Sequence, residues 1–319
     1  MKDLHPLVKR MRLPVCVAPM FLVSGPDLVL AACRAGVMGA FPTTNCRTLE
    51  ELEQWMERIT SGCAEAERSG IRTGPWAANL ITHSTNSRLA DDLALVARFK
   101  PPVVITALGS PAAVIDVVHG YGGLVIADVV NLGLARKAVA AGADGLACIS
   151  AGAGGHTGFL STFAFVSALR EFFDGLLIIG GGIADGYAVA GAIAAGADLV
   201  YMGTRFIPSV ESLAHDDYKT MVVNSDLNDL IVTAAVTGTP ASWLKPSLEQ
   251  AGFDIASTDG AATPRNYDAN DKGPKRWKNI WAAGQGLGSS KSIDLVGSVV
   301  DQLEADYRQA IQRISPTVS

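Results

Sequence analysis

Ala141-Gly142-Ala143-Asp144 is followed at once by an apolar run at 145–149, and the same four residue types return at 195–198, before a run at 199–202. In both places a stretch of helical length and mixed polarity ends in glycine, the usual residue just past the end of a helix. A short apolar run without polar alternation then indicates a strand buried on both faces. The repeated phrase therefore marks one kind of helix-to-strand turn and predicts a fold built from alternating strands and helices.

Apolar runs of this kind occur eight times in the first two thirds of the chain, at 15–18, 37–41, 76–80, 103–107, 124–127, 145–149, 176–179 and 199–202. Segments of helical length separate them, at 24–35, 48–59, 86–99, 112–118, 132–141, 162–173 and 187–195. This spacing implies parallel strands joined by right-handed crossovers. Open doubly wound sheets usually have about five or six strands, whereas eight strand–helix units close a barrel. The sequence therefore predicts an α/β fold, a (β/α)8 TIM barrel.

The rest of the chain does not continue this pattern. Residues 208–290 contain helical stretches and a loop rich in Gly, Asp, Asn and Pro at 257–275, and an amphipathic helix is expected at about 292–313. An insertion after the last strand lies on the active-site side of such a barrel. We expect the barrel over 1–207, a lid over 208–290 that faces the barrel mouth, and a C-terminal helix over 291–319 that packs back on the barrel.

The composition excludes several classes of protein. The net charge is −5, and the absence of a Lys or Arg run argues against nucleic-acid binding and against binding to an anionic membrane. The five scattered cysteines form no CxxC pair, so we expect no disulfide framework, no metal site, and buried or half-buried thiols in a reducing cytoplasm. No apolar run approaches the roughly 18 residues needed to span a bilayer. The sequence leaves open whether the chain forms a homodimer.

The most informative motif is the glycine-rich stretch at 151–158, Ala-Gly-Ala-Gly-Gly-His-Thr-Gly, directly after the sixth strand. Gly154 and Gly155 would let backbone N–H groups approach an anion or a flat ring. His156 would lie at the barrel mouth, where an imidazole with an unperturbed pKa of about 6.5 can act as acid or base. The alternative is a flexible loop with a solvated histidine, which the entropic cost of ordering so many glycines disfavours.

Two further glycine motifs follow the next two strands. Gly181 and Gly182 come after the seventh strand, and Met202, Gly203 and Thr204 end the eighth. The loops after strands seven and eight form the phosphate site of many phosphate-binding barrels. Glycine turns with a purely structural role are the alternative, but two motifs at consecutive positions favour a phosphate site. Their spacing is not that of a dinucleotide-binding GxGxxG motif.

Other candidate residues lie at the same end of the predicted barrel. Ala18, Pro19 and Met20 end the first strand, Asn79 ends the third, and Asp128 ends the fifth. Taken singly, Asn79 and Asp128 are as consistent with capping a turn as with contacting a ligand. Taken together, the five residues are candidates for cofactor binding.

These motifs resemble the nitronate monooxygenase family, formerly called 2-nitropropane dioxygenase, and the phrase Ala283-Gly284-Gln285-Gly286 extends the resemblance to about residue 300. The resemblance implies non-covalently bound FMN, with its phosphate on the Gly181–Gly182 and Gly203–Thr204 loops and its ring near 18–20, Asn79 and His156. It also implies oxidation of an alkyl nitronate by O2 to a carbonyl compound and nitrite. His156 would then remove the α-proton of a neutral nitroalkane.

The chain departs from the family pattern at one point. Many members carry Gln-Gly-x-Glu before the Ala-Gly-Gly-His phrase, whereas this chain has Ile-Ser-Ala-Gly at 149–152. A side-chain amide that would touch the flavin is therefore missing, which bears on the substrate class.

Two other functions stay open. Enoyl-thioester and NADH:quinone reductases share much of this pattern, so an FMN-dependent NAD(P)H reductase of a quinone or an enoyl thioester is the alternative. A CoA or carrier-protein thioester would favour basic residues at the mouth, where Arg205 and the stretch 272–276 are the candidates. A non-catalytic FMN- or phosphate-binding regulatory barrel is disfavoured, because binding alone does not require a titratable His156 at that place.

Overall fold

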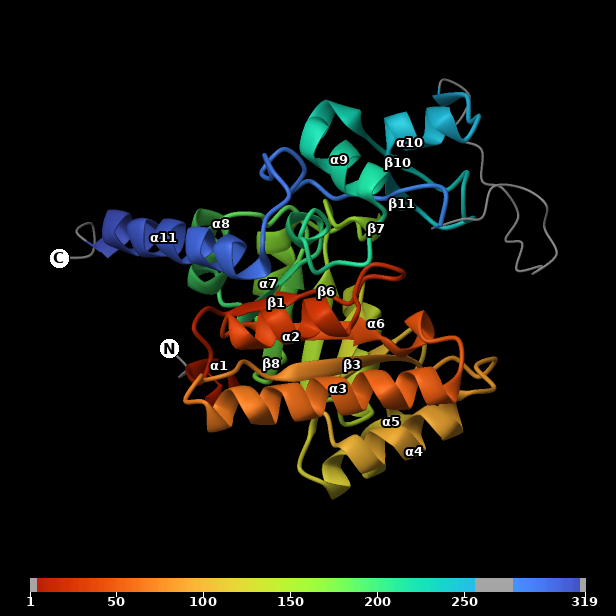
Figure 1. Ribbon diagram of the computed structural model, residues 1–319, viewed down its shortest axis with the longest axis vertical. Coiled ribbons are helices and arrows are strands. Elements are labelled where there is room, and N and C mark those ends of the chain that lie inside the picture. Colours follow the sequence, from red (N-terminus) through yellow and green to blue (C-terminus); the bar gives the residue numbers. More distant parts are fainter. Residues whose placement is uncertain (1–4, 256–277, 316–319) are drawn as a thin grey trace.

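The computed structural model describes residues 5–255 and 278–315, and its centre is a closed barrel of parallel strands (Figure 1). In barrel order the strands are β1 (Val15–Val17), β2 (Met38–Pro42), β3 (Trp76–Ile81), β4 (Val103–Ala107), β5 (Leu124–Val129), β6 (Gly145–Ile149), β8 (Leu176–Gly180) and β9 (Leu199–Met202). β9 pairs with β1 and closes the ring. The predicted (β/α)8 barrel is confirmed, and each predicted strand overlaps an observed one.

Helices surround the barrel. They are α2 (Pro26–Arg34), α3 (Leu49–Arg68), α4 (Leu89–Phe99), α5 (Ala112–Gly120), α6 (Leu132–Ala140), α7 (Thr162–Arg170), α8 (Gly186–Ala194) and α11 (Val296–Ile314). Side-chain oxygens accept hydrogen bonds at several N-termini, as Asn131 does from Leu134 N at 2.8 Å and Asp185 from Ala188 N at 2.7 Å. α11 packs against α8 and α2, so the C-terminal helix occupies the place of a helix following the eighth barrel strand (Figure 1).

The side chains of each strand alternate between the barrel interior and the surrounding helices. The interior is filled by small and medium apolar residues, among them Met38, Ile105, Ile126 and Ile178. The segment that contains α1 (Pro6–Lys9) packs into the same cluster through Val8 and Met11. The barrel is thus a packed core, and ligands can enter only at its ends.

A second, three-stranded sheet lies beyond the carboxyl ends of the barrel strands (Figure 1). Its order is β10 (Leu230–Thr233), β11 (Ala241–Leu244) and β7 (Gly155–His156), all antiparallel. α9 (Asp216–Asn224) and α10 (Lys245–Gln250) flank it along the chain, and two short 3-10 helices, η2 (Thr204–Phe206) and η3 (Leu227–Asp229), precede β10.

The structure differs from the sequence interpretation in this region. We expected a loop at 151–158 and helices after residue 208, whereas both contribute strands. β7 is two residues long and is extended because β11 pairs with it. Its own sequence therefore contains no pattern that predicts a strand. The β-branched run of β10 favours a strand and is short enough to be mistaken for part of a helix. The loop expected at 257–275 lies outside the described residues.

Other expectations concern thiols, metals and membranes. The free thiols of Cys16, Cys33, Cys46 and Cys148 are buried and that of Cys63 is half-buried, as the sequence predicts. Within the described ranges, no three acidic, His or Cys side chains are grouped as a metal site, and no helix is long and apolar enough to cross a membrane.

Candidate active site

A cavity of about 1290 Å³ opens at the carboxyl end of the barrel strands. Its walls come from the loops after the barrel strands, with residues 280–286 of the insertion on one side. Twelve of the residues predicted from sequence line it, namely Ala18, Pro19, Met20, Asn79, Asp128, Gly154, Gly155, His156, Gly181, Gly182, Gly203 and Thr204. The structure therefore brings residues from six barrel loops, far apart in sequence, into one site.

Met202 is not among the cavity-lining residues. Its side chain is 1% exposed and packs between the barrel and the helices. Because side chains alternate along β9, the preceding residue, Tyr201, points into the barrel interior and lines the cavity instead. Met202 is therefore a core residue, and sequence reasoning missed Tyr201.

His156 is exposed and lines the cavity from β7. Its backbone pairs with Ala241 of β11, and the next residue, Thr157, donates from its N–H to the Pro240 carbonyl at 3.3 Å. On the barrel side, the Thr157 hydroxyl donates to the Ser150 carbonyl at 3.2 Å. His156 is thus held between the insertion and the end of β6, which argues further against the alternative of a flexible loop with a solvated histidine.

Gly154, two residues before His156, lies where another segment of backbone leaves no room for a side chain. A Cβ on Gly154 would lie 2.7 Å from the backbone nitrogen of Gly284, and a Cβ on Gly284 would lie 2.5 Å from that of Gly154. The two backbones therefore pass each other at a separation that excludes any side chain. The Thr204 hydroxyl accepts from Gly284 N at 2.9 Å, which ties the same segment to the loop after β9.

A group of backbone donors lies at the ends of β8 and β9. Gly181 and Gly182 have φ of 137° and 69°, and a Cβ on Gly181 would lie 2.3 Å from Ser150 Oγ. Within the described residues, the N–H groups of Gly181, Gly203 and Thr204 donate to no protein acceptor. Grouped N–H donors at the ends of neighbouring strands can hold a phosphate, so this cradle fits the phosphate of a mononucleotide cofactor.

Gly182 contributes differently. Its N–H donates to the Gly152 carbonyl at 3.3 Å, so it supplies the turn and the space beside the cradle. A side chain there would have to adopt a left-handed backbone conformation that favours glycine.

Asp128 lies at the deep end of the cavity. It follows Ile126 by two residues on β5 and therefore points to the barrel interior. Burial raises the pKa of Asp128 to about 7, and the nearby Tyr201 hydroxyl opposes this by favouring the charged form. One Asp128 oxygen and the Tyr201 hydroxyl are buried and close enough to interact, but neither atom has a hydrogen bond of ordinary geometry among the described residues. Near neutral pH this carboxyl can therefore either donate or accept a hydrogen bond.

The loop after β1, which includes Met20, is held by Asn45. The Asn45 side-chain amide donates to the carbonyls of Met20 at 3.1 Å and Ser24 at 2.8 Å, and its oxygen accepts from Leu22 N at 2.9 Å. Leu22 has a φ of 60°, which is unusual for a residue other than glycine. Asn45 therefore fixes a strained loop that forms one wall of the cavity.

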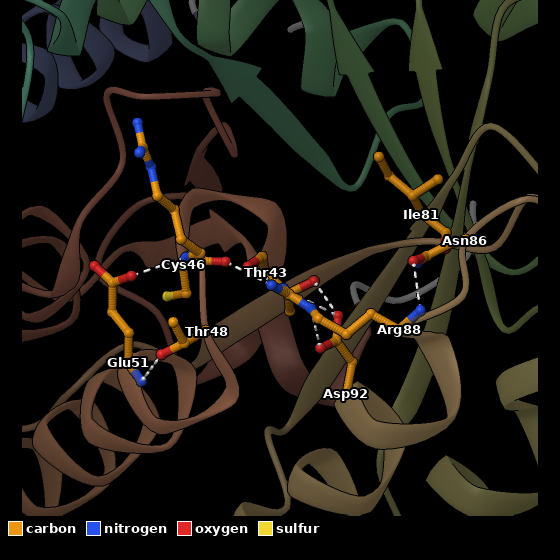
Figure 2. A network of polar contacts seen from close by, with 9 residues as sticks. Thr43, Cys46, Thr48, Glu51, Ile81, Asn86, Arg88 and Asp92 are labelled. Atoms are coloured by element: carbon orange, nitrogen blue, oxygen red, sulfur yellow. Dashed lines mark hydrogen bonds and ion pairs between the residues drawn. The ribbon is translucent and has the colours of Figure 1, made fainter. Parts of the chain in front are cut away.

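The residues on either side of Asn45 are held by an ion pair between the half-buried Arg88 and the buried Asp92 (Figure 2). The Arg88 guanidinium donates to Asp92 at 2.8 Å and to the carbonyls of Thr43 at 2.7 Å and Cys46 at 2.6 Å, the two residues that flank the Asn45 turn. The Thr43 hydroxyl also donates to Asp92 at 2.9 Å, and Asp92 is only 1% exposed. α4 thereby anchors the loop after β2, and through it the loop after β1.

The structure corrects one of the two cationic candidates expected for thioester binding. Arg205 is buried, and burial lowers its pKa; its guanidinium donates to the Ser290 hydroxyl at 3.0 Å, away from the cavity. The stretch 272–276 lies outside the described residues. Lys137 of α6 lines the cavity instead.

Ile149 lines the cavity at the start of the stretch where many family members carry Gln-Gly-x-Glu. The wall is therefore apolar there. Ser150, next along, is buried and donates from its hydroxyl to the Gly180 carbonyl at 2.7 Å, which joins the ends of β6 and β8.

A model of the family described as nitronate monooxygenase matches residues 5–303. The chain belongs to the nitronate monooxygenase family. It is an enzyme, a flavin-dependent oxidoreductase. A relative named nitronate monooxygenase, from Paraburkholderia phytofirmans, is 28% identical over 94% of both chains.

Solved structures of similar proteins share the architecture. A variant of FabK from Thermotoga maritima matches with a TM-score of 0.75 at 25% identity, over 98% of this chain and 97% of that chain. A nitroalkane oxidase from Streptomyces ansochromogenes matches with a TM-score of 0.77 at 22% identity, over 97% and 99%. At that identity the second likeness shows the barrel fold alone.

Proposed function

We propose that the enzyme oxidises alkyl nitronates with O2 to carbonyl compounds and nitrite, using non-covalently bound FMN and His156 as the base for neutral nitroalkanes. The observation that carries the proposal is the placement of His156 in one cavity with the backbone cradle at the ends of β8 and β9. A binding barrel would need the cradle, whereas a base facing the same space is needed only for chemistry.

FMN is favoured over FAD by the donors present. The N–H groups of Gly181, Gly203 and Thr204 suit one phosphate group, and the sequence holds no second glycine-rich site for an adenylate. Bound flavin would accept the electrons that leave the nitronate and pass them to O2.

The other residues of the site would bind the cofactor and exclude water. Asn79 donates through its amide to the Ile105 carbonyl at 3.4 Å, which orients the amide in the wall of the cavity. Ala18 and Ile149 make the neighbouring walls apolar. Apolar walls exclude water, and this strengthens electrostatic interactions within the site.

We further propose that the described parts of the insertion, 208–255 and 278–290, form a lid whose position sets that of His156. β11 of this segment pairs directly with β7, and Trp281 and Ala282 line the cavity.

The first experiment decides between this function and an NAD(P)H reductase. The purified holoenzyme is mixed anaerobically with propyl nitronate and, separately, with NADH or NADPH, and flavin absorbance is followed. Bleaching by the nitronate supports the proposal. Bleaching by the nicotinamide cofactor alone would make the enzyme a reductase.

The second experiment tests the base. His156→Asn should lower kcat/KM for neutral nitroethane by about 10²–10⁴-fold, the usual contribution of a positioned general base. Turnover of the preformed ethyl nitronate should fall far less, because that substrate has already lost its proton. His119→Asn, at an exposed histidine on α5 outside the cavity, is the control and should leave both rates unchanged. Equal losses on both substrates in flavin-replete His156→Asn would contradict the role as base.

A further inference from the structure

Four large apolar side chains that line the cavity are exposed to solvent: Phe21 in the loop after β1, and a group of three that follow β4 and β5, which we call the apolar rim. Leu108 in the loop after β4 is 66% exposed, Val130 after β5 is 37% exposed, and Leu134 in the first turn of α6 is 43% exposed. Exposed apolar side chains scattered singly need no explanation, but a group of them bordering a cavity is typical of a ligand site. The rim is continuous with the space that His156 faces.

The backbone holds Leu108 outward. Leu108 has a φ of 58°, in the left-handed region that residues other than glycine and asparagine rarely adopt. The next residue, Gly109, packs so tightly on the end of β3 that a Cβ would lie 2.4 Å from the carbonyl carbon of Thr82, and Thr82 N donates to the Ala107 carbonyl at 3.0 Å. A strained conformation that presents an apolar side chain to solvent at a cavity indicates a functional constraint.

α6 extends the rim. Leu134, Lys137 and Ala138 all line the cavity, and their spacing of three and four residues places them on one face of the helix. Lys137 is exposed, and within residues 5–255 and 278–315 no ion pair involves it. It is also the one Lys or Arg among the described residues that line the cavity. An ammonium group without an ion pair among the described residues therefore lines the cavity on the same helix face as Leu134 of the rim.

The volume of the cavity allows for a second ligand of some length. Pockets that hold one small molecule usually measure about 300–1,000 Å³, whereas this cavity measures about 1290 Å³. The excess leaves room for a substrate much larger than nitroethane beside a mononucleotide cofactor.

From these observations we infer that the substrate is amphipathic: a nitronate on an extended apolar chain that ends in an anionic group such as a carboxylate. The nitronate end lies near His156, the chain lies on Leu108, Val130 and Leu134, and the anionic end pairs with Lys137. This inference rests on the proposed function, whose substrate class it narrows.

The test measures kcat/KM for preformed propyl, pentyl and heptyl nitronates, each with and without a terminal carboxylate, on the holoenzyme. Preformed nitronates remove the need for the base. Full burial of one methylene group strengthens binding by about fourfold. Because the rim buries a bound chain only in part, kcat/KM should rise by about two- to fourfold per added methylene. The terminal carboxylate should raise it further for the longer chains.

Leu108→Asn should flatten the dependence on chain length while keeping the fold, because asparagine tolerates the left-handed conformation. Lys137→Met should remove the advantage of the carboxylate and leave the dependence on chain length. Ile71→Asn is the control, because Ile71 is exposed in the loop between α3 and β3, at the opposite end of the barrel. Ile71→Asn should change neither the dependence of kcat/KM on chain length nor the advantage of the carboxylate.

A flat dependence on chain length in an enzyme that does oxidise nitronates would overturn the inference and leave the proposed function standing. A change of oligomeric state in Leu108→Asn, seen by sedimentation, would also overturn it, because the rim would then be a contact between copies of the chain. If no nitronate is oxidised, the proposed function fails, and the rim is tested by ligand binding alone. Dodecanoate should then perturb the flavin spectrum at lower concentration than hexanoate in the wild type but not in Leu108→Asn. Equal dissociation constants of the two fatty acids for the wild type would refute the apolar site.

Discussion

Asp128→Asn should stabilise the protein at neutral pH and leave its stability unchanged in acid. In the folded protein, burial raises the pKa of Asp128 from 3.8 to about 7. The folded state therefore binds a proton more tightly than the unfolded chain, and the free energy of unfolding falls as pH rises between these two values. Below about pH 4 Asp128 is protonated in both the folded and the unfolded state, so its burial does not lower the free energy of unfolding. Above about pH 7 it is ionised in both states, and the loss of stability stays constant.

The magnitude follows from the shift. About three pKa units at about 1.36 kcal/mol per unit give an upper value of about 4 kcal/mol. Part of the Asp128 side chain faces the cavity, where water can reach it and reduce the penalty, so we expect about 2 kcal/mol. Asparagine has the same shape and no charge to bury, and the variant should therefore gain this amount at pH 7.5 and almost nothing at pH 4.

Urea unfolding of cofactor-free wild type and Asp128→Asn at a series of pH values from 4 to 8.5 measures the difference. Tyr201→Phe is the companion variant, because removing a hydroxyl that favours the charged form should move the pH window upward. The other titratable groups acting on this site are the buried thiols of Cys16 and Cys148, which stay neutral over this range. A difference between Asp128→Asn and wild type that is constant from pH 4 to 8.5 would refute the reasoning.

Two further predictions concern the cofactor and the loops. Gly182→Asp and Gly203→Asp should both give folded protein without flavin, because each adds a side chain and a negative charge beside the phosphate cradle; flavin released by heat and quantified by absorbance measures this, and undiminished content would place the phosphate elsewhere. Asp92→Ala should lower the free energy of unfolding by about 3–5 kcal/mol, because it leaves Arg88 without its buried partner. Glu53→Ala, which breaks the exposed pair with Arg98, is the control and should cost about 0–1 kcal/mol in the same urea titration; similar losses in both would contradict the role of the buried pair.

The barrel could be predicted from sequence because its signals are local. Each strand is a short apolar run, and each helix-to-strand turn, as at 141–144, ends in a glycine at a fixed offset. The carboxyl end of every strand then follows from the direction of the chain. That is why Asn79, Asp128 and the glycines after β8 could be placed at one mouth without coordinates.

The interpretation of Met202 shows where local reasoning went too far. The motif Met202-Gly203-Thr204 predicts three cofactor contacts only if the alternation of side chains along a strand is ignored. Applied to β9, that alternation points Tyr201 to the interior and Met202 to the helices, as the structure shows. The sequence thus contained the signal that identifies Tyr201 beside Asp128.

Other features of the site are non-local and could not be read from sequence. The glycine at 154 looks like a means of approach to an anion, yet its nearest constraint is the backbone of Gly284, which lies far away along the chain. Likewise, nothing near His156 indicates that it would join a sheet with Ala241. Such residues are specified by a partner that only the folded chain supplies.

These non-local contacts divide the site into two parts with different constraints. On the side of β6, β8 and β9, the backbones at Gly154 and Gly284 exclude side chains, the Thr204 hydroxyl accepts from the same segment, and β7 pairs with β11. A change in the insertion there would displace both His156 and the phosphate cradle. On the side of β4 and β5, the apolar rim and Lys137 contact the cavity through side chains that are largely exposed. Substitutions on that side cost little stability, because exposed side chains away from caps and networks contribute little. Under the proposed function, we therefore expect the substrate range to change through the rim while His156 and the backbone donors of the cradle stay fixed.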